Sequence, residues 1–288
     1  MSLSFHTYDP VTRRLDAAPG TVEAYPGGDV AVRHLESVSA RRPIAWNTGG
    51  ALDFAALAQW VAFHRDAEPV LVMPYLPSAR GDHDATYDAQ GVARLTAATG
   101  IREVIAADPH SGAWAAAASA HGAAVHSISA TELIKASPLA EIAWDGVIAP
   151  DKGAVDRAGA VDDLLGVALL TAGKMRDPKT GALSGFTAPD GLGAGRFLLV
   201  DDICDGGGTF AGLAQAIGAK EPAAELHLWV THGLFTGRWR ENLLPHFVSI
   251  TAANTGPGVD PDALPTEVRQ VPLIGHVLSV LTEKENWS

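Results

Sequence analysis

The stretch Arg196–Phe210, RFLLVDDICDGGGTF, constrains the fold of this chain more than any other part of the sequence. Its apolar run Phe197–Val200 has the length and branching typical of a fully buried parallel strand. The carboxylates Asp201 and Asp202 follow at the point where that strand should end, and the glycine-rich segment Asp205–Thr209 comes next. Because a helical pattern begins directly afterwards, this order predicts an α/β fold with a ligand site at the end of the strand.

The glycine-rich segment has the composition of a phosphate site. Gly206, Gly207 and Gly208 allow positive φ angles and close approach of backbone N–H groups to a phosphate, and the helix expected at 211–217 adds the positive end of its dipole. Thr209 can add a hydroxyl donor, whereas no lysine follows the glycines as a P-loop requires. Acids before such a loop are suited to orienting sugar hydroxyls or the waters of Mg²⁺. The alternative is a tight strand-to-helix turn with an acidic rim.

These residues resemble the 5-phosphoribosyl-1-pyrophosphate (PRPP) motif that type I phosphoribosyltransferases and PRPP synthetases share. The resemblance implies that Asp201 and Asp202 hold ribose hydroxyls and that Asp205–Thr209 binds the 5-phosphate. Gly206 stands where the family usually has a threonine. One side-chain donor is therefore missing, and there is more room beside the phosphate.

The acidic composition limits the partners of the chain. Its 288 residues carry a net charge of −12, which argues against general binding to nucleic acid or anionic membranes, because both need a basic surface. No run reaches transmembrane length, and the first residues lack the basic start and apolar stretch of a signal peptide. The single cysteine, Cys204, excludes an internal disulfide and predicts a cytoplasmic protein, with a small buried thiol favoured over a reactive one.

Strand and helix patterns alternate along the chain. A hairpin is expected over 21–35, where alternating residues flank a Pro-Gly-Gly turn. Strands are expected at 43–47, 70–73, 104–107, 124–129, 144–149, 197–200 and 226–230, and helices at 53–65, 88–98, 113–121, 131–138, 154–170 and 211–217. This alternation predicts mainly parallel sheets joined by right-handed crossovers.

A loop in the first half resembles a nucleotide-binding loop of PRPP synthetases. Two prolines in the segment Pro74–His83 exclude a continuing central strand, so the segment should leave the sheet. It is similar to the family's Pro-Tyr-x-x-x-Ala-Arg-Gln-Asp segment, whose arginine contacts ATP. The resemblance implies ATP binding by Arg80, Asp82 and His83, although a histidine replaces the family's basic residue at the last position.

Three further segments of the resemblance supply nucleotide and metal residues. Tyr25 and Asp29 lie in a segment similar to a Phe-x-Asp-Gly-Glu loop that helps bind ATP across a subunit boundary, which also implies a homo-oligomer. His110 matches the histidine that an Asp-Leu-His segment places at the Mg²⁺-ATP site. Asp151 matches the aspartate of a Ser-Pro-Asp-x-Gly segment that helps place metal and ribose. The resemblance thus implies Tyr25, Asp29 and His110 at ATP, and His110 and Asp151 at Mg²⁺.

Two segments of the second half complete the resemblance. Lys174 and Arg176 match the Lys-x-Arg unit of a catalytic hairpin, and the polar turn 177–181 fits a hairpin. Their implied role is to neutralise phosphoryl oxygens in the transition state. The segment Thr231–Gly237, THGLFTG, is similar to the family's Thr-His-Gly-Leu-Phe-Ser-Gly. A solvated basic loop is the alternative for Lys174 and Arg176.

The resemblance extends in order from about Tyr25 to Val280. It implies two related type I phosphoribosyltransferase-like α/β domains with mainly parallel sheets and the active site between them. We place the domains at residues 1–142 and 143–288. A last strand at 277–280 is expected to return to the N-terminal domain, with little of the family's usual final helix.

The implied activity is Mg²⁺-dependent transfer of the β,γ-pyrophosphate of ATP to the anomeric hydroxyl of ribose 5-phosphate, giving PRPP and AMP. The same transfer to a ribose whose phosphate carries a further group, such as ADP-ribose, is an alternative that the small Gly206 permits. A phosphoribosyltransferase that consumes PRPP and a catalytically silent regulatory relative are further alternatives.

Overall fold

The computed structural model describes residues 3–47, 53–82, 88–176, 183–256 and 264–285. The chain forms two compact units. Unit 1 comprises Met1–Ile128, Thr255–Pro257 and Leu273–Ser288, and unit 2 comprises Ser129–Asn254 and Gly258–Pro272. We expected the division at 142/143, but α4 (Ala130–Lys135) packs against α5 (Val155–Leu165), so the segment after Ile128 lies in unit 2.

Unit 1 is built on a six-stranded sheet in the order β2-β1-β5-β6-β7-β8. The four strands β5, β6, β7 and β8 are parallel, whereas β1 runs antiparallel to both β2 and β5. A separate antiparallel pair, β3 with β4, confirms the expected hairpin. The strands are β1 (Leu3–Asp9), β2 (Arg14–Ala17), β3 (Thr21–Ala24), β4 (Val30–Arg33), β5 (Arg42–Asn47), β6 (Val70–Val72), β7 (Glu103–Ala107) and β8 (Ala124–Ile128).

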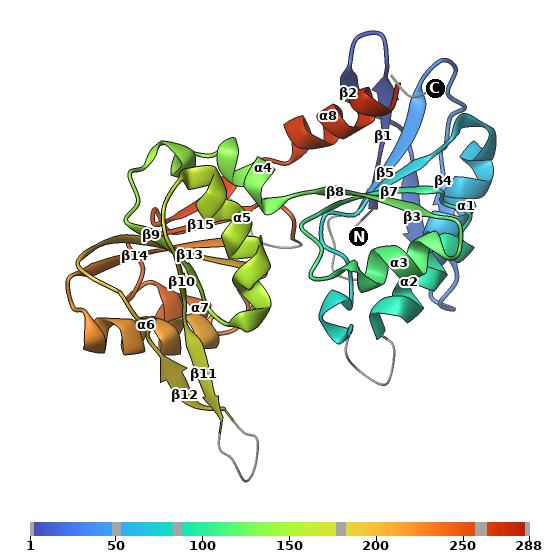
Figure 1. The fold of residues 1–288 in the computed structure, drawn as a ribbon. Coiled ribbons are helices and arrows are strands. Elements are labelled where there is room, and N and C mark those ends of the chain that lie inside the picture. The colour runs from blue at the N-terminus through green and yellow to red at the C-terminus, as the bar shows by residue number, and fades with distance from the viewer. Residues whose placement is uncertain (1–2, 48–52, 83–87, 177–182, 257–263, 286–288) are drawn as a thin grey trace. The chain divides into compact units, whose positions relative to one another are not determined.

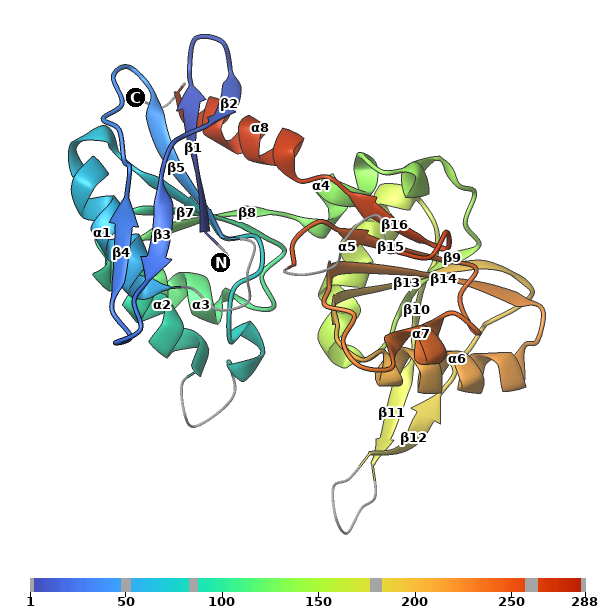
Figure 2. The ribbon, with the colours of Figure 1, turned by 180° about the vertical axis from the view of Figure 1, so that it is seen from behind.

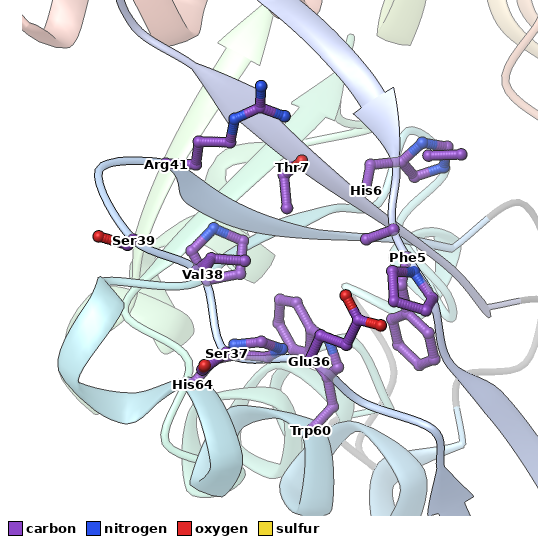
Figure 3. Close-up of a pocket in the computed structure, with 14 residues that line it drawn as sticks. Phe5, His6, Thr7, Glu36, Ser37, Val38, Ser39, Arg41, Trp60 and His64 are labelled. Carbon is purple, nitrogen blue, oxygen red and sulfur yellow. The ribbon is translucent and has the colours of Figure 1, made fainter.

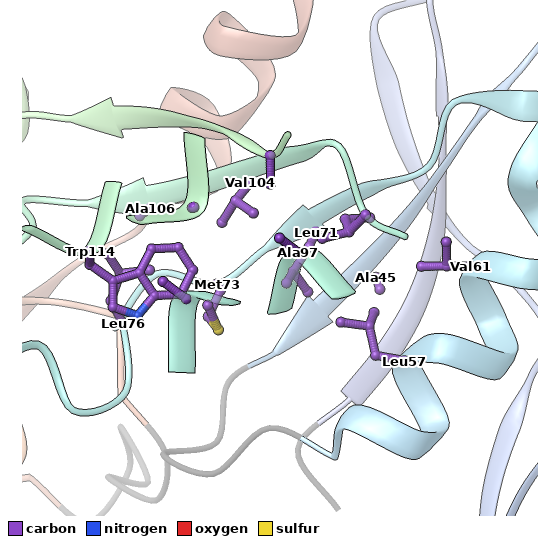
Figure 4. Close-up of a cluster of buried hydrophobic side chains, with 14 of the residues drawn as sticks. Ala45, Leu57, Val61, Leu71, Met73, Leu76, Ala97, Val104, Ala106 and Trp114 are labelled. Atoms are coloured by element: carbon purple, nitrogen blue, oxygen red, sulfur yellow. The ribbon is translucent and has the colours of Figure 1, made fainter. Parts of the chain in front are cut away.

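The helices of unit 1 pack apolar side chains onto this sheet. Asp53 caps α1 because its Oδ1 accepts a hydrogen bond from the backbone N of Ala56 at 2.9 Å. Leu57 and Val61, four residues apart on one face of α1, enter the same core as Leu71 of β6 (Figure 4). The helices are α1 (Phe54–His64), α2 (Asp88–Ala98) and α3 (Gly112–Ser119), with short 3₁₀ turns η1 (Arg65–Ala67) and η2 (Ala79–Gly81).

Unit 2 contains a six-stranded sheet in the order β10-β9-β13-β14-β15-β16, and all its neighbouring strands are parallel. Helix α5 covers one face of this sheet, and α6 (Gly208–Lys220) with α7 (Trp239–Leu243) covers the other (Figure 1). The strands are β9 (Gly146–Ala149), β10 (Leu169–Thr171), β13 (Gly195–Cys204), β14 (Ala224–Gly233), β15 (Ser249–Ala253) and β16 (Val268–Val271), and 3₁₀ turns are η3 (Pro138–Glu141) and η4 (Lys152–Ala154).

A two-stranded hairpin is inserted between β10 and β13. It consists of β11 (Gly173–Arg176) and β12 (Leu183–Thr187), which belong to neither large sheet. The hairpin extends beyond α6 in both ribbon views (Figures 1 and 2). The prediction of a hairpin around Lys174 is therefore confirmed, while its predicted turn 177–181 lies outside the described residues.

Two of the expected elements differ in extent, and β1 is a strand that was not expected. The helix expected over 154–170 ends at Leu165, because Gly166 adopts φ 68° and the chain then forms the edge strand β10. Strand β13 continues past the predicted end at residue 200 and pairs with β14 as far as Cys204. The strand β1 had no counterpart among the predicted elements.

The prediction of a last strand at 277–280 was wrong. These residues lie in α8 (Ile274–Glu285), so the final helix that we expected to be missing is present. Val277 and Leu281 are four residues apart and each is only 1% exposed, which is the spacing of a buried helix face. The segment does return to unit 1, where the hydroxyls of Tyr8 and Thr282 are 3.0 Å apart.

Candidate active site

The candidate site lies at the carboxyl ends of β9 and β13 in unit 2. These two strands are neighbours, and the strand order reverses at this point, because the chain leaves β9 for β10 on one side and β13 for β14 on the other. In open α/β sheets such a reversal opens the crevice in which ligands bind. Asp151 follows β9, and Asp201, Asp202 and the glycine loop come at the end of β13. The fold thus brings together three groups that the sequence predicted separately.

The acid pair at the end of β13 carries two different charges. Asp202 is 4% exposed, and one of its carboxylate oxygens lies 3.7 Å from Nη2 of Arg157 on α5. Burial, followed by repulsion from the charge of Asp202, raises the pKa of Asp201 to about 7. Arg157 therefore supports a charged Asp202, while Asp201 exchanges its proton near neutral pH.

Only one of the three loop glycines is required by the backbone. Gly207, the residue before α6, adopts φ 76°, and a β-carbon there would lie 2.8 Å from the side chain of Leu243. At Gly206 the nearest atom to a β-carbon would be the carbonyl oxygen of Thr236 at 3.7 Å, which is an ordinary contact. At Gly208 nothing lies within 4 Å. Gly206 and Gly208 therefore leave open space at the start of α6, where the helix dipole favours an anion.

The segment Thr231–Gly237 supports the glycine loop from behind. The hydroxyl of Thr236 donates a hydrogen bond to Oδ1 of Asp205, and its backbone N donates to the carbonyl oxygen of Asp205 at 3.2 Å. The side-chain amide of Asn242 donates to the carbonyl oxygen of Gly206 at 2.6 Å. These bonds orient the Asp205 carboxylate toward Thr236 and fix the course of the loop.

Cys204 has a packing role. Its side chain is fully buried, and this burial, followed by the charges of Asp201 and Asp205, raises the pKa of the thiol to about 12. The thiolate is therefore scarcely populated at neutral pH, and the prediction of a buried, unreactive thiol is confirmed.

Lys174 reaches the site from the hairpin. Its Nζ donates a hydrogen bond to Oδ2 of Asp151, and the other carboxylate oxygen accepts one from the backbone N of Gly153 at 2.8 Å. Burial raises the pKa of Asp151, but the hydrogen bond and positive charge of Lys174 outweigh it, so the net pKa is lower than the ordinary value. The ion pair of Lys174 and Asp151 thus lies at the end of β9, the neighbour of strand β13.

Comparison with known proteins agrees with this geometry. Over 227 residues the chain is 27% identical to ribose-phosphate pyrophosphokinase of Maricaulis maris, covering 75% of this chain and 72% of that protein. It is 31% identical over 142 residues to the enzyme of that name from Pyrococcus abyssi, covering 48% of this chain and 45% of the relative. No family model matches the chain.

The fold matches that of a solved relative over nearly its full length. The crystal structure of phosphoribosylpyrophosphate synthetase from Mycobacterium smegmatis superposes with a TM-score of 0.76 at 20% identity, covering 94% of this chain and 92% of that one. The chain is therefore similar to ribose-phosphate pyrophosphokinases over most of its length, and it has the fold of a phosphoribosylpyrophosphate synthetase.

Residues of the family's nucleotide loops lie in unit 1. Arg80 is in η2, which follows β6, and His110 lies beyond the end of β7. Because β6 and β7 are parallel neighbours, both residues lie at the same edge of the sheet. Asp82 directly follows η2, whereas His83 lies outside the described residues.

The β3–β4 turn holds the other two nucleotide residues of the family pattern. Tyr25 is 43% exposed, and its hydroxyl accepts a hydrogen bond from Nη2 of Arg33 at 3.0 Å. Asp29 closes the turn with its backbone oxygen, which accepts from the backbone N of Tyr25 at 2.8 Å. An exposed ring held by Arg33 is available for stacking, and nucleotide binding here stays a prediction.

Sequence reasoning missed three residues that shape the site. Arg157 carried no local signal, because its pairing with Asp202 depends on α5 crossing beside β13. Thr236 belonged to a recognised segment without an assigned role, and Asn242 lies in the helix after it. Of the predicted Lys174 and Arg176, the structure describes the side chain of Lys174 only, while the backbone of Arg176 pairs within the hairpin.

Unit 1 also encloses a small cavity away from these residues. It has a volume of about 290 Å³ and is lined by β1, the segment after β4 and α1, with Phe5, His6, Trp60 and His64 among its walls (Figure 3). None of the predicted site residues lines it.

In the described part of the chain, no helix combines the length and apolar character needed to cross a bilayer.

Proposed function

We propose that this protein transfers the β,γ-pyrophosphate of ATP to the anomeric hydroxyl of ribose 5-phosphate, giving PRPP and AMP. The observation that carries the proposal is the strand-order reversal in unit 2, which gathers the acid pair, the glycine loop and the Lys174–Asp151 pair at one edge of a parallel sheet. The similarity to ribose-phosphate pyrophosphokinases supports the same reaction.

Different residues of unit 2 bind the hydroxyls and the phosphate of the acceptor sugar in this proposal. Asp201 and Asp202 hold the ribose hydroxyls as hydrogen-bond acceptors, with Arg157 keeping Asp202 charged. The backbone N–H groups of Asp205–Thr209 and the start of α6 bind the 5-phosphate. This arrangement leaves the anomeric hydroxyl free to attack, and the sugar is held by both ends.

The reaction needs charge neutralisation more than covalent catalysis. The anomeric oxygen attacks the β-phosphorus of ATP, a new P–O bond forms, the bond to the oxygen that leaves with AMP breaks, and the hydroxyl proton is released. Lys174 and Arg176 stabilise the phosphoryl oxygens as negative charge shifts toward AMP. Tyr25, Asp29, Arg80, Asp82, His83 and His110 bind ATP in this proposal.

The residues present fit Mg²⁺ as the implied metal. Within the described ranges no group of three or more His, Cys, Asp and Glu side chains forms a complete metal site. Mg²⁺ does not need one, because it is usually held by one or two carboxylates together with substrate phosphates and waters. Asp151 of unit 2 would supply a carboxylate, and His110 of unit 1 is the second residue that the resemblance implies at the metal. When bound, the ion neutralises the phosphate oxygens of ATP.

A second acceptor is favoured by the open space at Gly206. Since a β-carbon there meets no atom closer than 3.7 Å, the fold does not require glycine, and the missing side chain leaves room for a substituent on the 5-phosphate. A 5-substituted ribose phosphate such as ADP-ribose is therefore the second candidate. A PRPP-consuming transferase would not need the Lys174 hairpin.

The deciding measurement is AMP release from Mg²⁺-ATP with ribose 5-phosphate and ADP-ribose offered separately, and the sugar product identified by mass. We expect ribose 5-phosphate to gain a pyrophosphate. The variant Gly206→Thr should favour ribose 5-phosphate further by adding a donor, with stability within about 0.5 kcal/mol of the parent. Preference for ADP-ribose would select the second candidate, and no AMP with either sugar would refute both.

The family resemblance also predicts a homo-oligomer that acts in the cytoplasm. The proposed sharing of the Tyr25 loop between subunits is the basis of this expectation. Light scattering after size exclusion gives the oligomer size directly, and a purely monomeric active enzyme would contradict it.

A further inference from the structure

The hairpin that carries Lys174 packs on unit 2 through helix α6. Strands β11 and β12 form a two-stranded sheet outside the six-stranded one, and an isolated hairpin of this kind is marginally stable in water. Strand β12 packs on α6, and the ring of Phe186 joins the core formed by α6 and the sheet. The hairpin therefore depends on this contact for its place.

Phe186 sits on a glycine of α6. A β-carbon at Gly212 would overlap the ring of Phe186, so the absence of a side chain there creates the seat. Gly212 lies one helical turn after Gly208, where α6 begins in the phosphate loop. The seat thus ties the hairpin to the same helix whose start faces the predicted phosphate.

The register of the hairpin connects this seat to the catalytic lysine. Lys174 of β11 pairs directly with Phe186 of β12, and side chains opposite each other in an antiparallel pair share one face. With Phe186 seated on Gly212, the neighbouring side chain of Lys174 reaches Asp151 at the end of β9. The aromatic contact thus places the strand that carries Lys174, and the ion pair with Asp151 holds the ammonium group.

We propose that Phe186, seated on Gly212, is the positioning residue that holds Lys174 in place for pyrophosphoryl transfer. This proposal rests on the proposed function. The seat takes the place of the sheet hydrogen bonds that the hairpin lacks, and it keeps the lysine within reach of Asp151. A displacement of about 1 Å in a catalytic group can lower a rate by about 100-fold, so a weakened seat acts on turnover.

The test compares two alanine substitutions in the same helix. Gly212→Ala fills the seat, whereas Gly218→Ala is the matched control, because a β-carbon at position 218 has no atom within 4 Å. Alanine favours the helix at both positions, so a loss of stability in Gly212→Ala alone comes from the overlap with Phe186. We expect Gly212→Ala to lower kcat by about 10- to 100-fold with KM for ribose 5-phosphate within about 3-fold, and Gly218→Ala to match the parent.

A second variant and a structural measurement complete the test. Adding Phe186→Leu to Gly212→Ala should recover part of kcat, because a smaller side chain relieves the overlap. In ligand-free protein, hydrogen exchange at 173–176 and 183–187 should be faster in Gly212→Ala than in Gly218→Ala. Equal kcat in the two alanine variants would overturn the positioning role, and equal exchange would overturn the seat. An inactive parent with unequal exchange would refute the proposed function and leave the seat intact.

Discussion

At the scale of single residues, the acid pair shows how burial gives neighbouring carboxyls different properties. Asp202 has Arg157 at 3.7 Å, and the side chains of both are almost buried. Asp201 has the charge of Asp202 beside it, which disfavours a second charge after burial has already done so. Asp201 is therefore about half protonated at neutral pH, and both carboxyls can accept hydrogen bonds from sugar hydroxyls.

This pair predicts a pH dependence of stability. The pKa of Asp201 rises from 3.8 to about 7 on folding, so between these values the folded protein binds more protons and stability falls as pH rises. Asp201→Asn removes the buried charge, and its stability relative to the parent should be greater by roughly 2 kcal/mol at pH 8 than at pH 5. Urea unfolding at both pH values measures the difference.

The control for this prediction is Asp190→Asn. Asp190 is fully exposed and pairs with Lys220 at the surface, so its substitution should change stability equally at both pH values. If Asp201→Asn behaves like this control, the carboxyl of Asp201 is not the source of the pH dependence.

At the scale of elements, hydrogen bonds from the chain after β14 fix the course of the glycine loop Asp205–Thr209. Thr236, between β14 and α7, donates hydrogen bonds to Asp205, and Asn242 of α7 donates one to Gly206. Leu234 donates its backbone N to the carbonyl oxygen of Cys204 at 2.8 Å. Phe235 accepts φ 48° to make this course possible, which is a strained value for an aromatic residue. The strain indicates that the position of the segment matters.

Removing one of these bonds should weaken acceptor binding. Thr236→Val keeps the shape of the side chain but removes the hydroxyl that donates a hydrogen bond to Asp205. The carboxylate is then held less firmly toward Thr236, and its charge disfavours a phosphate at the loop. We expect KM for ribose 5-phosphate to rise by about tenfold, the equivalent of about 1.4 kcal/mol. Initial-rate kinetics measure this change. Thr236→Ser retains the hydroxyl and should remain near the parent, and similar KM values in both variants would argue against the bond.

At the scale of the whole molecule, unit 1 is built from both ends of the chain, and unit 2 lies between them in sequence. The last helix, α8, follows the strands of unit 2 in sequence but packs against β8 of unit 1. Unit 1 is therefore completed only when the last residues are in place. The net charge of −12 also means that anionic substrates are attracted by local groups, Lys174 and the start of α6 among them, and not by the overall field.

Shortening a buried side chain of α8 should destabilise unit 1. Leu281 is 1% exposed, so Leu281→Ala should lower the free energy of unfolding by about 2–5 kcal/mol. Ile274→Ala on the same helix is the control, since Ile274 is 43% exposed and should cost about 0.5 kcal/mol or less. Hydrogen exchange in β8 should rise in the first variant only. Equal effects of the two substitutions would show that α8 is not a structural part of unit 1.

The sequence by itself determined the elements whose signals are local. The run before Asp201, the glycines after it and the alternation around 21–35 predicted β13, the phosphate loop and the β3–β4 hairpin, because side-chain branching, glycine content and period act over a few residues. The order of motifs from Tyr25 onward then indicated the family. The prediction of a strand at 277–280 was wrong because four apolar or small residues fit a strand and a helix equally. Packing on unit 1 decided in favour of the helix.

Only the tertiary structure decided which residues act on one another. The pairing of Arg157 with Asp202, the support of Asp205 by Thr236 and the seat of Phe186 on Gly212 join residues that are 26 to 45 positions apart. Such contacts depend on how helices cross strands, which no local pattern encodes. The same packing makes glycine necessary at 207 and optional at 206. The amino-acid sequence of the loop does not distinguish the two positions, because the difference depends on the atoms that surround each one.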